Sequence, residues 1–284
     1  MDLTMYSISI KELEYRFLVK LIYDKTGINL GDNKRELLKT RLGKRLRALG
    51  LKSYGDYIEY TTNPLNEGEM THLINAISTN FTSFFREGHH YDLLRKTVLG
   101  DIAARKEPSG SKRIRAWCAA ASSGEEPYSL AITMLEYFKD ISAWDIKLLA
   151  TDISSKVLTE AFKGTYSQEK VKMISPFILE RYFNRESGEK GAMFRVNDEL
   201  RDLIVFRRLN LMDEAFPFRG PFDFIFCRNV LIYFDPPTQE MIVAKLLKYL
   251  PTGGYLFTSH SENLPPVFRN QVEIPAPAVY RKIK

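Results

Sequence analysis

Two adjacent carboxylates follow a tight turn in "IRAWCAAASSGEEPYSLA", which runs from Ile114 to Ala131. A strand-like run ends in small residues, a Ser-Ser turn closes at Gly124, and a helix-like pattern begins with Glu125 and Glu126. A helix start after a strand offers free N–H groups and the positive end of its dipole to a ligand. Two acids there would repel a phosphate, so the turn favours a ligand with cationic character. The alternative is that both acids only stabilise the helix dipole, by roughly 0.3–1 kcal/mol.

Polar side chains also follow two further strand-like runs. Asp152 ends the run in "KLLATDIS", 28 residues after Gly124, and Asn229 and Tyr233 follow the run in "FDFIFCRNVLIYFD". Ligands of open parallel sheets bind at the carboxyl ends of the strands, and an acid about 20 residues beyond the glycine turn holds ribose hydroxyls in dinucleotide-binding folds. The alternative for Asp152 is an N-cap of the next helix.

The histidines and cysteines predict neither a metal site nor nucleophilic catalysis. Cys118 and Cys227 lie in apolar runs, which is typical of packed, reduced thiols. No histidine has metal-ligand spacing with them, so we expect no metal. The four histidines are His72, His89, His90 and His260.

Basic residues cluster between Gly31 and Lys52, where eight Lys or Arg face two acids. Lys34, Arg41 and Arg45 stand at i, i+7 and i+11 of a predicted helix and so share one side of it. That side is either a solvated face or a surface that binds an acidic partner.

From residue 114 onward, alternating strands and helices predict an α/β fold with a mainly parallel sheet covered on both faces. We expect strands at Ile114–Ala119, Ile146–Thr151, Phe222–Cys227 and Gly254–Ser259, and helices at Pro127–Lys139, Ser154–Ala161 and Gln239–Leu250. Between Gly164 and Ile204 the alternation breaks, and "NRESGEKGAMFRV" is typical of a hairpin, which we interpret as an insertion at the sheet's edge. The end, "AVYRKIK", predicts a last antiparallel strand.

The first eighty residues predict a small all-α unit. Its first two helices each carry an apolar stripe at helical spacing, ended by Gly27 and Gly50. The stripes are Leu13, Phe17, Leu21 and Ile22 in the first helix, and Leu38, Leu42, Leu46 and Leu49 in the second. We expect shorter helices at Tyr54–Tyr60 and Asn66–Ile77.

Composition places the chain among globular proteins. It has 284 residues, and no apolar run approaches the roughly 18 to 20 residues of a membrane span. The first residues lack the pattern of a signal peptide, so we expect a cytoplasmic protein. The net charge of +6 favours acidic partners without indicating nucleic acid in particular.

Six short motifs occur in one order along the chain: "NFTSFFRE" (Asn80–Glu87), "WCAAASSGEEPYSLA", "ATDIS", "LNL" (Leu209–Leu211), "FDFIFCRNVLIYFD" and "SHSEN" (Ser259–Asn263). Taken together, these motifs resemble the bacterial chemotaxis-receptor protein-glutamate O-methyltransferases, which use S-adenosylmethionine. The resemblance covers nearly the whole chain. It implies a helical domain at residues 1–88, a linker helix and loop at 89–112, and a Rossmann-like class I methyltransferase domain at 113–284, with a small β-subdomain inserted at about 165–204.

The resemblance also implies roles for individual residues. Glu126 would face the cationic amino group of S-adenosylmethionine, and Asp152 would bind the ribose hydroxyls. Arg86 and Tyr233 would hold the acceptor carboxylate and act as the catalytic residues. The remaining cofactor contacts would be Thr82, Arg86, Ala119, Ala120, Gly124, Asn210, Leu211, Asn229 and Val230.

The implied acceptor is a glutamate in the cytoplasmic helices of a chemoreceptor. Its side chain is ionised at neutral pH, so methyl transfer to it needs no general base. The basic helix would dock on the acidic receptor surface through Lys34, Arg41, Lys44 and Arg45. In part of the family the β-subdomain also binds a receptor C-terminal peptide. We expect a monomer that neither inserts into the membrane nor binds nucleic acid.

Two other functions remain open from the sequence. A nucleic-acid methyltransferase would share the cofactor fold, but its Asn-Pro-Pro-Tyr or Pro-Cys motif is missing near the fourth strand, where the order is Arg-Asn-Val-Leu. A non-catalytic module that senses the cofactor would not need Arg86 and Tyr233.

Overall fold

The computed structural model describes residues 8–31, 34–138, 141–188 and 191–284. The chain divides into two compact units, Met1–Thr79 with Tyr233–Asp235, and Asn80–Ile232 with Pro236–Lys284. Residues 80–88, which the sequence prediction assigned to the helical domain, therefore belong with the second unit. No helix among the described residues is both long and apolar enough to cross a membrane.

The first unit is helical. Its elements are α1 (Glu12–Thr26), α2 (Arg35–Leu49), α3 (Tyr54–Thr62), η2 (Pro64–Asn66) and α4 (Glu67–Ile77). The predicted stripe of α2 is confirmed, since Leu38, Leu42 and Leu46 are fully buried. Gly50 ends this helix in the left-handed conformation that glycine adopts without a steric penalty.

The predicted stripe of α1 is wrong at Leu13 and Phe17, whereas Ile22 is buried as predicted. Leu13 and Phe17 are exposed, with relative accessibilities of 81% and 46%, whereas Tyr15 and Leu18 are buried beside Ile22. Residues 15, 18 and 22 have helical spacing as well, so the pattern alone did not decide between the two faces. Tyr15 can face the core because its hydroxyl donates a hydrogen bond to the carbonyl of Gly31 at 2.6 Å.

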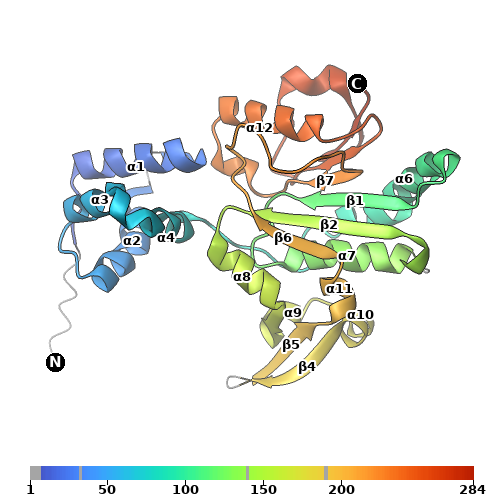
Figure 1. The fold of residues 1–284 in the computed structure, drawn as a ribbon, viewed down its shortest axis with the longest axis horizontal. Coiled ribbons are helices and arrows are strands. Elements are labelled where there is room, and N and C mark those ends of the chain that lie inside the picture. Colours follow the sequence, from blue (N-terminus) through green and yellow to red (C-terminus); the bar gives the residue numbers. More distant parts are fainter. Residues whose placement is uncertain (1–7, 32–33, 139–140, 189–190) are drawn as a thin grey trace. The chain divides into compact units, whose positions relative to one another are not determined.

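The second unit contains a sheet of seven strands in the order β6-β2-β1-β7-β8-β10-β9 (Figure 1). The first five are mutually parallel, and β10 runs antiparallel to both of its neighbours, β8 and β9. The bounds are β1 (Arg113–Cys118), β2 (Asp145–Asp152), β6 (Ile204–Arg208), β7 (Phe224–Phe226), β8 (Tyr255–Phe257), β9 (Val272–Ala276) and β10 (Val279–Lys282). The four predicted parallel strands and the last antiparallel strand are confirmed, whereas β6 and β9, at the two edges, were not predicted.

Helices cover both faces of this sheet (Figure 1). Alternate side chains of β1 point to opposite faces: Ala116 and Cys118 join the core under α7, and Trp117 packs against Phe216 and Tyr249 on the other side. The covering helices are α5 (His89–Leu93), the π-helical turn η3 (Leu94–Val98), α6 (Leu99–Lys106), α7 (Glu125–Tyr137), α8 (Ser155–Lys163) and α12 (Pro236–Lys248). Sequence analysis predicted α7, α8 and α12 to within three residues at each end.

A small subdomain is inserted between α8 and β6. Its sheet has the order β3-β5-β4, and β4 pairs with β5 as the predicted hairpin. The turn of that hairpin, residues 189–190, lies outside the described residues. The elements are β3 (Thr165–Ser167), α9 (Gln168–Val171), α10 (Pro176–Tyr182), β4 (Phe183–Gly188), β5 (Gly191–Val196) and α11 (Asp198–Arg201).

Candidate functional site

The carboxyl ends of β1, β2 and β7 are joined by backbone hydrogen bonds of the turn after β1. Ala119 N–H donates to the carbonyl of Phe226 at 2.8 Å, and Ala121 N–H donates to the carbonyl of Thr151 at 2.9 Å. Ser122 adopts a positive φ of 47° and donates its N–H to the carboxylate of Asp152 at 2.9 Å. The turn and Asp152, which the sequence predicted to meet from the position of strand ends, therefore form one site.

Gly124 is required both by its backbone conformation and by the side chains packed around it. It has φ +99°, and a Cβ placed there would lie 2.6 Å from the hydroxyl of Tyr166 and 3.0 Å from Ala161. Tyr166 donates a hydrogen bond to the carbonyl of Ser123 at 2.8 Å. The missing side chain thus allows β3 and α8 to pack on the turn, in addition to giving α7 its left-handed N-cap.

Asp152 is held by backbone groups at the end of β2. Its carboxylate accepts hydrogen bonds from Ser122 N–H and Ser154 N–H, each at 2.9 Å. Ser154, not Asp152, is the N-cap of α8, so the alternative interpretation of Asp152 is wrong. Burial raises the pKa of Asp152, and the N–H donors oppose that shift. The buried carboxylate is thus a fixed acceptor at the turn.

Glu126 forms a buried ion pair with Arg228, which follows β7. Nη1 of Arg228 lies 2.5 Å from Oε2 of Glu126, and the two side chains are 0% and 8% exposed. The other oxygen of Glu126 accepts from the thiol of Cys118 at 3.4 Å. Burial raises the pKa of Glu126, and the positive charge of Arg228 opposes that shift. On Arg228, burial lowers the pKa and the carboxylate of Glu126 raises it, and the net shift is upward. Arg228 was not among the predicted site residues, because its partner is 102 positions away.

Glu125, the other acid of the turn, does not join this pair. It is fully buried and accepts from Lys170 at 2.6 Å and from the hydroxyl of Ser123 at 2.7 Å. Since Lys170 belongs to α9, Glu125 anchors the inserted subdomain to the start of α7. The two adjacent acids therefore have different partners.

Arg86 lies on a loop whose backbone is strained on both sides. Phe85 and Glu87 have positive φ values of 51° and 59°, which non-glycine residues rarely adopt. Arg228 donates to the carbonyl of Arg86 at 2.8 Å, and Phe85 N–H donates to the hydroxyl of Ser129 at 2.9 Å. The loop is thus built against the Glu126–Arg228 pair, and such strain is common at functional sites.

The side chain of Arg86 turns back along its own segment. Its guanidinium donates to the carbonyl of Phe81 at 3.0 Å and lies over the Phe81 ring, 5.5 Å from its centre. Thr82, in the same segment, is half-buried.

Glu262 organises the loops after β7 and β8, and sequence reasoning missed it. Its buried carboxylate accepts from the N–H groups of Asn229 and Ser259 at 2.8 and 2.9 Å, and from Ile232 N–H at 3.3 Å. Asn229 has a positive φ of 55°, so Glu262 stabilises an unusual backbone at that predicted cofactor contact. The only sequence signal was its place in the "SHSEN" motif.

Asn210 and Leu211 follow β6, and Leu209 N–H donates to the carbonyl of Asp152 at 3.0 Å. Leu211 is buried, with its carbonyl accepting from the ammonium group of Lys245, and Asn210 accepts from Met212 N–H at 3.1 Å. Of the remaining residues, Ala119 is buried, and Ala120 and Val230 are half-buried.

Tyr233 and the basic helix belong to the first unit. The backbone carbonyl of Tyr233 accepts from Asn29 N–H at 2.8 Å. This bond fixes the backbone of Tyr233 within the helical unit, and the catalytic role of its side chain stays a prediction from the sequence.

Two of the four predicted receptor contacts make bonds inside the helical unit. Arg41 donates to the carbonyl of Ile77, and Arg45 pairs with the buried carboxylate of Glu69 at 2.5 Å. That pairing raises the pKa of Arg45. Lys34 and Lys44 are exposed. The single basic face inferred from the sequence thus divides into structural arginines and solvent-facing lysines.

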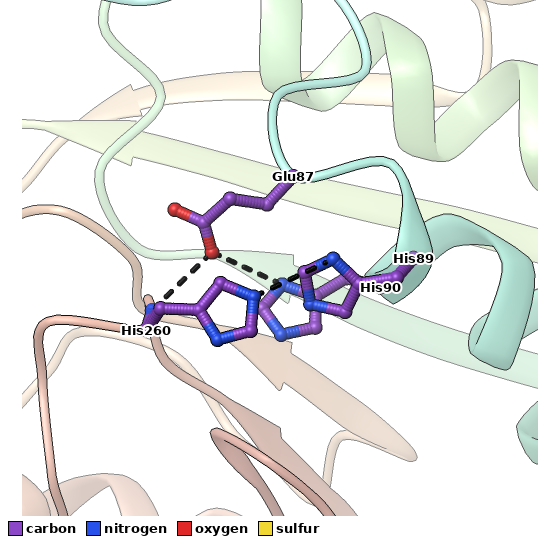
Figure 2. Close-up of side chains that lie close together, drawn as sticks. All are labelled: Glu87, His89, His90 and His260. Atoms are coloured by element: carbon purple, nitrogen blue, oxygen red, sulfur yellow. Dashed lines mark hydrogen bonds and ion pairs between the residues drawn. The ribbon is translucent and has the colours of Figure 1, made fainter.

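A second group of polar side chains lies on the other side of Arg228. Glu87, His89, His90 and His260 each offer one ligand atom, and these atoms lie within 4.8 Å of one another (Figure 2). Burial and the guanidinium of Arg228 lower the pKa of His90 to about 3, so its ring is neutral. The sequence prediction of no metal-ligating set missed this group because its members come from two segments about 170 residues apart.

Both cysteines are buried and reduced. Cys118 ends β1 and Cys227 follows β7, and each is fully buried. Burial raises the pKa of both thiols, which disfavours the reactive thiolate. The prediction of packed thiols is confirmed.

Comparison with known proteins decides the family. Residues 80–277 match the family described as "CheR methyltransferase, SAM binding domain", and residues 13–78 match "CheR methyltransferase, all-alpha domain". The chain belongs to the CheR methyltransferase family. Residues 80–277, which include the ends of β1, β2 and β7, therefore form the family's S-adenosylmethionine-binding domain, and the helical unit contains its all-alpha domain.

Named relatives agree with this assignment. The chain is 40% identical to a probable chemotaxis protein methyltransferase of Rhizobium etli, over 86% of this chain and 90% of the relative. It is 38% identical to the chemotaxis protein methyltransferase of Borreliella burgdorferi, over 97% and 96%. It is 41% identical to that of Escherichia coli, over 90% and 86%.

The residues present fit S-adenosylmethionine chemically. Two buried carboxylates lie here, Glu126 in the first turn of α7 and Asp152 at the end of β2. The positive charge beside Glu126 belongs to Arg228 and is already paired with that carboxylate. These hydrogen-bond acceptors suit the donor groups of ribose hydroxyls and an ammonium, and they disfavour the phosphates of a dinucleotide.

Proposed function

We propose that this CheR methyltransferase transfers the methyl group of S-adenosylmethionine to glutamate carboxylates in the cytoplasmic helices of chemoreceptors. The observation that carries the proposal is one connected set of bonds: Arg228 links the carboxylate of Glu126 to the backbone of Arg86. A cofactor-binding acid and a candidate acceptor-binding arginine therefore depend on the same buried side chain. The products would be glutamyl methyl esters, which set receptor adaptation in chemotaxis.

The cofactor would be held mainly by carboxylates and backbone. Asp152 would accept from the ribose hydroxyls, and Glu126 from the ammonium group of the methionine moiety. Arg228 acts as a positioning residue, since its guanidinium binds Glu126, Glu87 and the backbone of Arg86. The further contacts would come from the Ala119–Gly124 backbone, Thr82, Asn210, Leu211, Asn229 and Val230. When bound, S-adenosylmethionine supplies an electrophilic methyl group on its sulfonium.

The protein's own contribution to the reaction is alignment and exclusion of water. A receptor glutamate has an ordinary pKa near 4.3 and is ionised at neutral pH, so the site needs no residue that removes a proton. Arg86 would hold the acceptor carboxylate through a charge-assisted hydrogen bond, and Tyr233 would donate a second. Both must leave one carboxylate oxygen free to attack, and fixing that geometry accounts for most of the rate.

The activity is tested with labelled S-adenosylmethionine and membranes that contain the organism's own chemoreceptors. We expect label on receptor protein that is released as methanol by alkali, because glutamyl methyl esters are base-labile. Label on nucleic acid instead would support the rival methyltransferase class. Binding of cofactor without any transfer would support a sensing module.

The role of Arg86 is tested with Arg86→Ala, and Arg95→Ala is a matched control on the surface of the following helical segment. We expect Arg86→Ala to lower kcat on the order of 10²-fold, as loss of one hydrogen-bond donor does at other sites, with little change in affinity for S-adenosylhomocysteine. Arg95→Ala should change neither kcat nor the affinity for S-adenosylhomocysteine. Loss of cofactor binding in Arg86→Ala would contradict an acceptor-binding role.

Receptor docking would use the exposed lysines of the first unit. Charge reversal at Lys34 and Lys44 is expected to raise KM for receptor and to flatten its salt dependence, with cofactor affinity unchanged. Arg45→Glu is a poorer test, because it also leaves the carboxylate of Glu69 without its main partner, which costs on the order of 2 kcal/mol. An unchanged KM in the double lysine variant would remove this surface from the proposal.

A second receptor contact would use the inserted subdomain. Strand β4 lies at one edge of its sheet, and an extended receptor peptide could add to that edge by backbone hydrogen bonds. Such tethering would raise the local concentration of the enzyme at the receptor. Titration with the receptors' C-terminal peptides tests it, with peptides of scrambled order as the control. We further propose that the protein works in the cytoplasm as a monomer.

A further inference from the structure

We propose that Glu87, His89, His90 and His260 form a binding site for a transition-metal ion of the Zn²⁺ type. The four side chains come from the Arg86 loop, the start of α5 and the loop after β8, and their ring and carboxylate groups converge (Figure 2). Three imidazoles and one carboxylate are a ligand set typical of zinc, whereas magnesium and calcium prefer oxygen ligands. The site goes beyond the methyltransferase activity and does not depend on it.

The distances are close to those that a tetrahedral ion requires. Zinc–nitrogen bonds of about 2.0–2.1 Å place neighbouring ligand atoms about 3.3 Å apart. Nε2 of His260 lies 3.5 Å from Nδ1 of His89, and Nδ1 of His90 lies 3.6 Å from Oε2 of Glu87. All four ligand atoms lie within 4.8 Å of one another, so small side-chain rotations would bring them to coordination distance from one ion. His89 and His260 are exposed and can make those rotations.

His90 provides an independent observation. Its side chain is fully buried, and the carboxylate of Glu87 and the backbone of Pro277 lie near its ring, yet neither ring nitrogen makes a well-formed hydrogen bond within the described part of the chain. Buried polar atoms usually have a partner. Nδ1 faces the carboxylate of Glu87, and the ring of His90 lies 4.1 Å from that of His89, centre to centre. An ion between these groups supplies the missing partner.

The positive charge of Arg228 is compatible with such an ion. Arg228 lies 3.2 Å from Oε2 of Glu87, but its charge is already balanced by Glu126 at 2.5 Å. Oε2 of Glu87 also accepts from the backbone N–H of His260 at 3.3 Å. A carboxylate has two oxygens and about four acceptor positions, so Glu87 can bind these two donors and an ion together. The ion would connect the Arg86 loop to the loop after β8, which carries Glu262. It would thus brace two loops of the methyltransferase site.

The experiment measures Zn²⁺ binding by the full-length chain without a polyhistidine tag, after treatment with a chelator. Competition with a chromophoric zinc indicator gives affinity and stoichiometry. We expect one ion per chain, no comparable binding of Mg²⁺, and a loss of affinity of at least about 100-fold in His89→Ala/His260→Ala. His72→Ala is the matched control, because His72 is the one histidine outside the cluster and is also exposed.

Thermal unfolding provides a second readout. Zn²⁺ should raise the unfolding temperature of the wild type and of His72→Ala, but not that of the double variant. His260→Gln serves as a milder variant if the double variant unfolds. Absence of stoichiometric Zn²⁺ binding by the wild type, equal loss in His72→Ala, or full binding by the double variant would each overturn the proposal.

Discussion

The guanidinium of Arg228 contacts the carboxylate of Glu126 at 2.5 Å, and the same guanidinium donates to the backbone carbonyl of Arg86 at 2.8 Å. A residue after β7 therefore sets both the start of α7 and the loop before α5. Because both side chains are buried, each charge relies on the other for the stabilisation that solvent would otherwise give.

The first prediction concerns this pair. Arg228→Met leaves the carboxylate of Glu126 buried without its partner and should lower the free energy of unfolding by about 3–5 kcal/mol. Glu126→Gln/Arg228→Met removes both charges and should recover much of that loss. Urea denaturation measures both variants. Calorimetry with S-adenosylhomocysteine should find weak cofactor binding in the double variant, because residue 126 no longer presents a carboxylate. Equal stability of the single variant and the wild type would contradict a coupled buried pair.

The second prediction concerns pH. Burial raises the pKa of Asp152 above its ordinary 3.8. Cofactor hydroxyls need the ionised carboxylate, so affinity should fall as the pH drops through that raised pKa, earlier than for an exposed aspartate. The effect on folding stability has the opposite sign. The folded state binds the Asp152 proton more tightly than the unfolded state does, so this proton stabilises the fold below pH 3.8. That stabilisation is lost as the pH rises through the raised pKa of the folded state.

Calorimetry between about pH 4.5 and about pH 7.5 checks the affinity, with Asp152→Asn as the comparison. The variant should bind weakly and with a flatter profile. A profile unchanged by Asp152→Asn would assign the titration to another group.

The third prediction concerns the strained loop around Arg86. Ser129→Ala removes the acceptor of Phe85 N–H and should lower kcat about tenfold, because Arg86 is less well placed. It should also cost about 1–2 kcal/mol of stability. Thr133→Val is the matched control, since Thr133 is also buried in α7 and also donates to a carbonyl of the preceding turn, and it makes no hydrogen bond to the loop among the described residues. Equal effects of the two variants on kcat would mean that the loop does not depend on Ser129.

The fourth prediction separates two demands on glycine. Gly110 has a positive φ and no atom within 4 Å of the place where a Cβ would lie, so Gly110→Ala should cost only about 1 kcal/mol of backbone strain. Gly124→Ala adds a clash with the Tyr166 hydroxyl and with Ala161, and should cost on the order of 3 kcal/mol. Denaturation of both variants gives the difference. Gly124→Ala/Tyr166→Phe should regain part of the loss, and equal losses for the two glycines would argue against the clash.

The sequence predicted the central strands because β1, β2, β7 and β8 are short apolar runs bounded by turns. It missed both edge strands: β6 ends in Arg207 and Arg208, and β9 contains Pro275, which are features that edge strands tolerate. Edge strands lack the continuous apolar run that identifies a buried one.

The strand-end acids were predictable because parallel topology fixes where strands end. The partners of those acids were not. Arg228, Glu262 and the histidine cluster act through contacts between residues far apart in sequence, which no local pattern encodes. The same limit explains the wrong face of α1, where two stripes with helical spacing compete and only tertiary packing chooses between them.

Cys118 and Cys227 are the chain's two cysteines: Cys118 ends β1, and Cys227 follows the neighbouring strand β7. A thiol reagent reaches them only when this part of the sheet opens. The rate of labelling of the folded chain therefore reports how often the centre of the sheet opens, without any introduced probe. A ligand that binds only the closed form lowers this labelling rate, and the decrease grows with the fraction of the protein that is occupied.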